Sequence, residues 1–182
     1  MSRNYTNLTF TDSVKSTQEH YGARASGAKV ESWDIDDEHL SAVEASFIAA
    51  RDSFYMATVN QDGWPYLQHR GGPRGFLKVI DSQTLGFADY RGNRQYISAG
   101  NLRENDRTAL FFMDYPNQRR LKLMVRTESF DADERPDLEF LRDADYSGRV
   151  ERLILFHVAA FDWNCPQHIT PRYSEAEWES SP

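Results

Sequence analysis

The sequence predicts a mainly β protein of the α+β class, an antiparallel β-barrel with flanking helices. Six or seven short segments have strand-like patterns and are joined mostly by hairpin turns. The glycine-rich loops that hold nucleotide phosphates in doubly wound α/β folds, G-x-G-x-x-G and G-x-x-x-x-G-K-[ST], are absent from the sequence. With 182 residues, 40% of them hydrophobic, the chain is long enough for one core and too short for two ordinary domains.

The chain divides into an N-terminal segment, residues 1–35, and a single domain, residues 36–182. The segment lacks a clear hydrophobic period, so we expect it to wrap over the surface. A helix is expected from Asp36 to Arg51, capped by Asp36 or Asp37. Its apolar positions share one face: Leu40, Val43, Phe47 and Ile48.

The strand pattern starts at Ser53 and runs to Trp163. SFYMATV and YLQHRGG form a hairpin around Asp62-Gly63, because Asp-Gly favours a tight turn. The remaining expected strands are GFLKVI, TLGFADY, RTALFFMDY, LKLMVRTESF and RVERLILFHVAAFDW. The last alternates little between apolar and polar residues and is therefore expected to be buried on both faces. Helices are expected in NRQYISAGNL and RPDLEFLRDA.

The charge of the chain is unevenly distributed. Its net charge is −7, but the stretch from Arg70 to Arg126 contains eleven Lys and Arg against five Asp and Glu. A negative total argues against a general nucleic-acid binder. The basic middle of the chain favours a small anionic ligand, or is a basic face balanced by acidic ends.

The cysteine count and the N-terminus favour a cytoplasmic location. One cysteine cannot form an intramolecular disulfide, and the N-terminal residues do not resemble an export signal. The longest apolar runs are far below the roughly 20 residues of a membrane-spanning helix. We therefore expect no membrane segment.

The stretch FADYRGNRQYISAGNL, residues 87–102, has the pattern of a strand that ends in a turn and leads into a helix. Asn93 would cap that helix, with Arg94 and Gln95 beside it. Free N–H groups at a helix N-terminus bind phosphate, so this turn is a candidate phosphate site. The alternative is an ordinary turn with an exposed arginine.

Two further basic stretches are candidate ligand contacts. In QHRGGPRGFLK, residues 68–78, the glycines allow close backbone approach, and Arg70, Arg74 and Lys78 neutralise an anion. The alternative is a glycine-rich bulge between strands. The basic residues of NQRRLKLMV lie where a strand begins, which is more typical of a solvated strand end.

Cysteine and histidine chemistry is poorly supported. Cys165 and His168 are three residues apart, but this spacing alone does not create a nucleophile and base pair. The five histidines have no zinc-ligand spacing, so no metal site is expected. His157 lies in the apolar last strand, where a core histidine is expected.

Taken in order, these motifs resemble the pyridoxamine 5'-phosphate oxidase-related proteins, the FMN-binding split-barrel family. The segments that carry the resemblance are QHRGG, GFLKVID, TLGFADYRGNRQYISAGNL, LFFMDY, RRLKLMV and FDWNCPQHITPRY, over about Asp36 to Tyr173. The resemblance implies a six-stranded split barrel, a homodimer and one FMN in each of two clefts at the subunit interface. It further implies a flavoprotein, an FMN-dependent oxidoreductase that acts on an unknown small molecule or on NAD(P)H.

The resemblance also implies which residues bind the cofactor. Asn93, Arg94 and Gln95 would hold the phosphate, and Trp163 would cap the flavin ring, which makes FDWNCPQHITPRY a wall of the cleft with Cys165 as a small packed residue. The full implied set is Arg70, Gly75, Phe76, Leu77, Lys78, Asp89, Tyr90, Asn93, Arg94, Gln95, Arg120, Trp163, Gln167 and Arg172. No acid or base is identified; the candidates for proton transfer are His168, His69 and Tyr90.

The chain departs from the true oxidase in residues 131–151, DADERPDLEFLRDADYSGRVE, which are strongly acidic where the oxidase binds a substrate phosphate. Unless Arg135 or Arg142 turns inward, a vitamin B6 phosphate would be repelled. Other functions stay open: a flavin carrier or sensor without turnover, a haem-binding barrel using His69, His157 or His168, or a deazaflavin protein.

Overall fold

The computed structural model describes residues 3–33 and 35–179 and contains one antiparallel sheet of seven strands. The order across the sheet is β2-β1-β5-β6-β7-β4-β3. The strands are β1 (Ser53–Val59), β2 (Pro65–Gly71), β3 (Lys78–Val79), β4 (Thr84–Tyr90), β5 (Arg107–Asp114), β6 (Arg119–Asp131) and β7 (Val150–Trp163). The predicted fold class is confirmed, and the seventh strand is the two-residue β3 at one edge.

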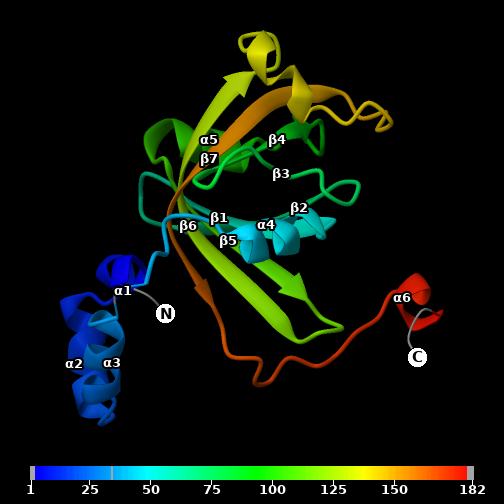
Figure 1. Ribbon diagram of the computed structural model, residues 1–182. Coiled ribbons are helices and arrows are strands. Elements are labelled where there is room, and N and C mark those ends of the chain that lie inside the picture. The colour runs from blue at the N-terminus through cyan, green and yellow to red at the C-terminus, as the bar shows by residue number, and fades with distance from the viewer. Residues whose placement is uncertain (1–2, 34, 180–182) are drawn as a thin grey trace.

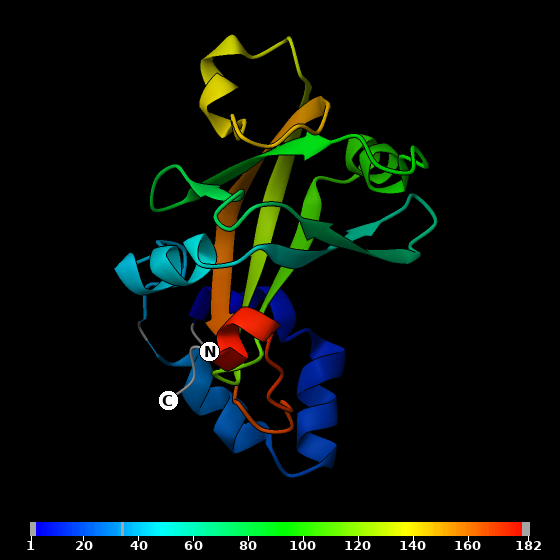
Figure 2. The ribbon, with the colours of Figure 1, turned by 90° about the vertical axis from the view of Figure 1, so that its right-hand side faces the viewer.

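The sheet curls into a barrel around an aromatic core. Phe54 of β1 and Phe87 of β4 have ring centroids 5.7 Å apart, although three strands separate β1 from β4 in the sheet. Phe112 and Phe156 pack on the same Phe54 ring. Burying several such rings, which are almost completely inaccessible to solvent, stabilises the barrel. Figure 2 shows the strands wrapping around this interior.

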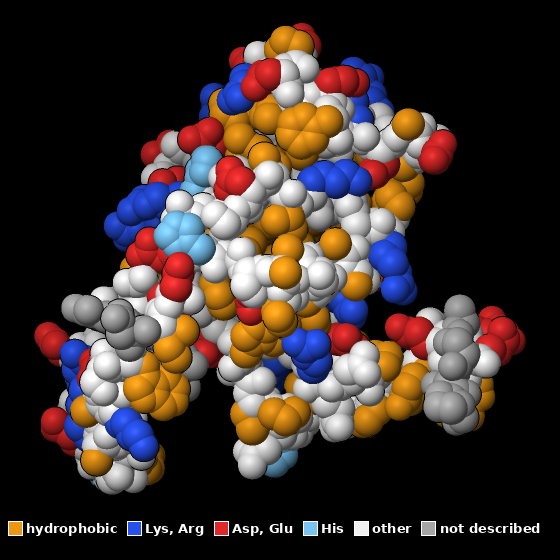
Figure 3. Space-filling view, in the orientation of Figure 1, with side chains coloured by type: hydrophobic (Ala, Val, Ile, Leu, Met, Phe, Trp, Pro, Cys, Tyr) orange, Lys and Arg blue, Asp and Glu red, His pale blue; other side chains and the backbone are white. Residues whose placement is uncertain are grey.

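Short helices flank the barrel (Figure 1). They are α1 (Arg3–Thr9), α2 (Asp12–His20), α3 (Arg24–Glu31), α4 (Ala42–Ala49), α5 (Ile97–Glu104), the 3-10 helix η1 (Pro136–Leu141) and α6 (Glu175–Glu179). The η1 segment covers the upper end, and α1–α3 project at the lower end. The surface is hollowed between these helices and the lower end of the barrel (Figure 3).

The N-terminal segment is more helical than its sequence pattern indicated. Its helices are nine residues or shorter and have no long apolar stripe, and α2 is capped by Thr11, whose side chain accepts from the Val14 N–H. The Tyr5 N–H donates to the Asp37 carboxylate at 2.7 Å, which fastens α1 to the barrel domain.

The helix expected from Asp36 begins later. α4 is capped by Ser41, whose side chain and that of Glu44 form a capping box. Asp36 instead closes a turn by accepting from the Glu38 and His39 N–H groups, and Asp37 is buried beneath α1. The predicted caps were therefore wrong, because both carboxylates have partners before the helix starts.

Three strand and helix expectations need correction. Only two residues of GFLKVI are a strand, because Phe76 and Leu77 turn into the core after Gly75, which has a φ of +77°. Within RPDLEFLRDA, where a helix was expected, only Pro136–Leu141 are helical, and they form a 3-10 helix. β7 is buried on both faces only from Leu153 to Phe156, where η1 covers it, and then alternates.

The prediction that His157, on β7, lies in the core was also wrong. Its side chain is 43% exposed and faces Glu128 on β6 at 3.4 Å. In the part of the chain that is described, no helix has the length and apolar character needed to cross a bilayer.

Candidate anion-binding site

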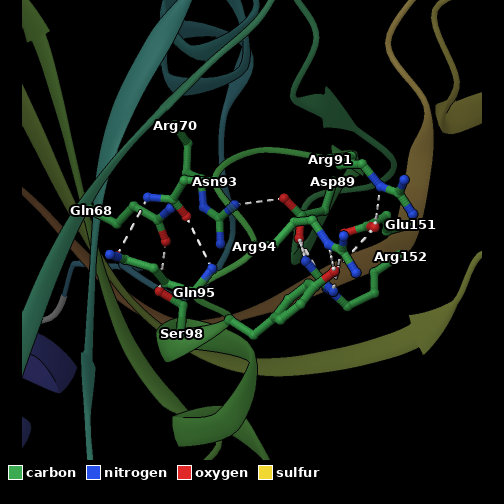
Figure 4. Close-up of polar contacts among 11 residues, drawn as sticks. Gln68, Arg70, Asp89, Arg91, Asn93, Arg94, Gln95, Ser98, Glu151 and Arg152 are labelled. Carbon is green, nitrogen blue, oxygen red and sulfur yellow. Dashed lines mark hydrogen bonds and ion pairs between the residues drawn. The ribbon is translucent and has the colours of Figure 1, made fainter.

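A cavity of about 170 Å³ lies where β2, the end of β4 and the start of β7 meet the N-terminus of α5. Its lining comprises Tyr66, Gln68, Arg70, Asp89, Tyr90, Gly92, Asn93, Arg94, Gln95, Tyr96, Ile97, Ser98, Ala99, Glu151 and Arg152. Figure 4 shows that Arg70 of β2, Asp89 of β4 and Arg152 of β7 converge from strands far apart in the sequence. Barrel closure is therefore what creates the cavity.

The floor of the cavity is a buried ion-pair network centred on Asp89. Arg70 Nη1 lies 2.5 Å from Asp89 Oδ1, and Arg152 Nη2 lies 2.6 Å from Asp89 Oδ2. Burial lowers the pKa of Arg70, and the Asp89 carboxylate opposes that shift. The Nε of Arg70 is buried without a hydrogen-bond partner among the described residues, so the site retains an unused donor.

The loop between β4 and α5 has a strained backbone. Arg94 and Tyr96 have φ angles of +62° and +54°, a left-handed conformation that is costly for residues other than glycine. Tyr96, not Asn93, is the N-cap of α5, and its side chain makes no capping hydrogen bond. Asn93 Oδ1 instead accepts from the Gln95 N–H at 3.1 Å. The predicted cap was wrong because the chain makes this additional turn before the helix.

Glu151 fastens both ends of this loop. Its Oε1 accepts from Arg91 Nε at 2.7 Å and from the Tyr96 hydroxyl at 3.2 Å. The hydrogen bond from Arg91 lowers the pKa of Glu151. The carboxylate therefore stays ionised at neutral pH and holds the strained loop against β7.

The arrangement is suited to binding an anion. The first turn of α5 presents backbone N–H groups that no side chain caps, and Ile97, Ser98 and Ala99 of that turn line the cavity. The lining contains three arginines and two carboxylates, so it carries a net positive charge. The Ser98 hydroxyl is held by Gln68 Oε1 at 2.8 Å.

The structure brings together six of the residues implied by the family resemblance: Arg70, Asp89, Tyr90, Asn93, Arg94 and Gln95. Gly75, Phe76 and Leu77 lie before β3, the latter two inside the core. Lys78 does not line the cavity; its Nζ lies 2.6 Å from Asp143 Oδ1.

The C-terminal residues of the implied set lie elsewhere. Trp163 packs edge-on against Phe47, and its Nε1 donates to Glu44 at 2.7 Å. Arg172 lies over the Tyr115 ring, and Gln167 is exposed. Arg120 lies on β6, and its backbone carbonyl accepts a hydrogen bond from the Asn164 N–H.

Of the proposed proton-transfer residues, only Tyr90 lines the cavity. His69 on β2 packs against Tyr55, and His168 is exposed with a φ of +65°. Cys165 is exposed, not packed as expected, because the chain leaves the barrel after Trp163.

Sequence reasoning missed several residues of the lining. Gln68 could have been predicted, since Tyr66, Gln68 and Arg70 are every second residue of β2 and therefore share one face of the strand. Glu151 and Arg152 had none, because their position follows from the pairing of β4 with β7, two strands about sixty residues apart along the chain.

The fold and the cavity define a class of protein, a β-barrel with a cavity of net positive charge beside a strand-turn-helix. The sequence matches the family model described as pyridoxamine 5'-phosphate oxidase over residues 40–159. The chain belongs to this family.

Solved structures support the fold at low sequence identity. HupZ from Group A Streptococcus is 15% identical with a TM-score of 0.55, over 74% of this chain and all of its own. A candidate pyridoxamine 5'-phosphate oxidase from Lactobacillus delbrueckii is 17% identical with a TM-score of 0.54, over 70% of this chain and 97% of that one. An FMN-binding protein from Syntrophomonas wolfei is 14% identical with a TM-score of 0.52, over 66% and 83%. No curated protein matches the sequence.

Proposed function

We propose that this protein binds FMN and is an FMN-dependent oxidoreductase that acts on a small molecule. The observation that carries the proposal is the uncapped N-terminus of α5 beside Arg94 in the cavity, in a chain of this family. An FMN-binding protein among the structures of similar fold adds support. The bound flavin would supply the hydride chemistry, and the protein would supply binding and orientation.

The cavity residues divide into two groups by chemistry. Asn93, Arg94, Gln95 and the first turn of α5 provide donors for a phosphate. Arg70 and Tyr90 provide a cation and a hydroxyl further along the cavity. Asp89 keeps Arg70 in position, and the strained loop is preorganised by Glu151, so little ordering is needed when the anion binds.

We propose that the protein works as a homodimer and that each FMN site uses residues of both copies. Trp163, Gln167 and Arg172 would complete the site, but Trp163 lies roughly 35 Å from Arg152 along β7. A second copy would bring this segment to the cavity. The single cysteine supports a cytoplasmic location.

Titration with FMN tests the proposal. Replacing Arg94 by Ala removes a phosphate donor and is expected to weaken FMN binding at least tenfold. Arg103→Ala removes the same charge from the last turn of α5, outside the cavity lining, and is expected to change the Kd less than twofold. Equal effects of the two variants, or no FMN binding by the wild type, would refute the assignment.

A further inference from the structure

A second cavity, of about 580 Å³, adjoins the first along α5. Tyr96, Ala99 and Arg152 line both cavities, so the two spaces share a wall. Within this wall, Cζ of Arg152 lies 5.2 Å from the centroid of the Tyr96 ring. A molecule in the second cavity would therefore lie next to the group bound in the first. The other lining residues are Gly100, Leu102, Arg103, Ser129, Asp131 and Glu134.

Gly100 leaves room in the second cavity. It lies inside α5, where glycine is less favourable than alanine. A Cβ at Gly100 would meet no atom within 4 Å apart from its own helix backbone and its chain neighbours. Packing within the described chain therefore does not require a glycine here, whereas a ligand in the cavity that Gly100 lines would account for it.

The charged groups of the second cavity differ from those of the first. Arg152 already pairs with Asp89 at 2.6 Å, whereas Arg103 has no ion-pair partner among the described residues. Asp131 and Glu134 belong to one tight turn after β6, in which the Asp131 N–H donates to Glu134 Oε2 at 3.0 Å. The lining therefore combines two neighbouring carboxylates, an available cation and a tyrosine ring.

This combination of groups suits a nucleotide. Carboxylates accept hydrogen bonds from ribose hydroxyls in dinucleotide-binding folds. An arginine pairs with phosphate oxygens, and an aromatic ring stacks on a base. A further phosphate on the ribose would be repelled by the two carboxylates. The lining thus fits a nucleotide whose ribose hydroxyls are free.

We infer that the second cavity binds the adenosine diphosphate part of NADH, and that NADH is the electron donor of this protein. The inference rests on the proposed function, because a flavin-dependent oxidoreductase needs a donor or a substrate beside its cofactor. Transfer of a hydride from NADH, with one proton from solvent, would convert FMN to its reduced form FMNH₂ and leave NAD⁺. The shared wall puts the nucleotide beside the cofactor site, and the carboxylates disfavour the 2'-phosphate of NADPH.

Calorimetry with ADP-ribose tests the inference on the FMN-supplemented protein. ADP-ribose contains the same adenosine diphosphate without the nicotinamide, so its binding is measured without flavin reduction. Wild type is expected to bind ADP-ribose, and to bind AMP about tenfold more tightly than adenosine 2',5'-bisphosphate, because the second phosphate is repelled. Gly100→Leu fills part of the cavity and is expected to weaken ADP-ribose binding about tenfold, because the added side chain takes the space of the ligand.

A matched pair of variants tests the carboxylates. Glu134→Gln removes one charge but keeps an acceptor for the Asp131 N–H, and should reduce the preference for AMP to about threefold or less. The control, Asp133→Asn, removes the same charge from an exposed residue of the same turn that does not line the cavity. It is expected to leave the preference unchanged.

Three results would overturn the inference: wild type that does not bind ADP-ribose, equal effects of Glu134→Gln and Asp133→Asn, or far tighter binding of FAD than of FMN. The last result would assign the adenosine position to the cofactor. The wild-type preferences decide the question even if Gly100→Leu fails to fold. FMN content is measured on the same samples. FMN bound without ADP-ribose binding refutes only the inference, whereas ADP-ribose binding without FMN refutes the proposed function and leaves a nucleotide site.

Discussion

Asp89 holds two strands of the barrel together and also lines the cavity. It is 2% exposed, and it binds Arg70 from β2 and Arg152 from β7. Two largely buried arginines would be costly without this carboxylate, because charges removed from water need close partners. The carboxylate was expected to contact the cofactor, but the structure gives it a second role in joining the strands.

Replacing Asp89 by Asn tests this structural role. The change leaves two arginines without their carboxylate, so a loss of about 3–5 kcal/mol in the free energy of unfolding is expected. Asp106→Asn breaks an exposed ion pair with Arg126 and is expected to cost at most about 1 kcal/mol. Urea unfolding measures both. A similar small loss for the two variants would contradict the account.

At the scale of elements, α4 and the end of β7 are joined through Glu44. This carboxylate closes the capping box with Ser41 and accepts from the Trp163 indole. Burial favours a higher pKa for Glu44, but the hydrogen bonds from Ser41 and Trp163 outweigh it and lower the pKa below its ordinary value of 4.5. The ionised form therefore stabilises the fold.

Glu44→Gln should lower the free energy of unfolding by about 1–3 kcal/mol at neutral pH. A carboxylate whose pKa is lowered by folding stabilises the folded state at pH values above its unfolded-state pKa. This stabilisation is lost as the pH falls through its folded-state pKa. The difference in unfolding free energy between Glu44→Gln and wild type should therefore shrink at pH values below 4.5, the ordinary pKa of a Glu. Unfolding measured across pH checks this, with Glu104→Gln at the exposed end of α5 as the control. A difference independent of pH would contradict it.

Elements with a repeating pattern were predictable, and those fixed by individual contacts were not. β1 and β4 match their expected bounds, because alternation and turn residues mark them. The cap of α4 was missed although Ser41 and Glu44 have the S-x-x-E spacing of a capping box, and the cap of α5 was missed because the chain makes an extra turn before that helix. The turn between β4 and α5 was predicted from its sequence, whereas the places of Glu151 and Arg152 depend on the register of β7 with β4.

At the scale of the whole molecule, the proposed sharing of one site between two copies would account for the separation of the implied site residues. The basic stretch contributes Arg70 and Arg94 to the cavity, while Arg172 lies in the segment after β7. If the site is shared in this way, dimers that combine two different variants should behave differently from dimers of either variant alone.

Arg94→Ala and Arg172→Ala should each weaken FMN binding, because the proposed shared site takes one of these arginines from each copy. Refolding an equal mixture should restore one normal site in each mixed dimer, since one copy keeps Arg94 and the other keeps Arg172. FMN titration of the mixture against each variant alone measures this, with light scattering to check for twice the 21.1 kDa chain mass. No recovery in confirmed mixed dimers would show that each site uses one chain only.

The most direct test of FMN binding is the visible absorption spectrum of protein purified without added cofactor, with the released chromophore identified after denaturation. We expect flavin absorption and FMN at about one per chain, consistent with one cavity in each copy. A colourless protein that takes up no added FMN, or one that releases haem or a deazaflavin, would contradict the central claim.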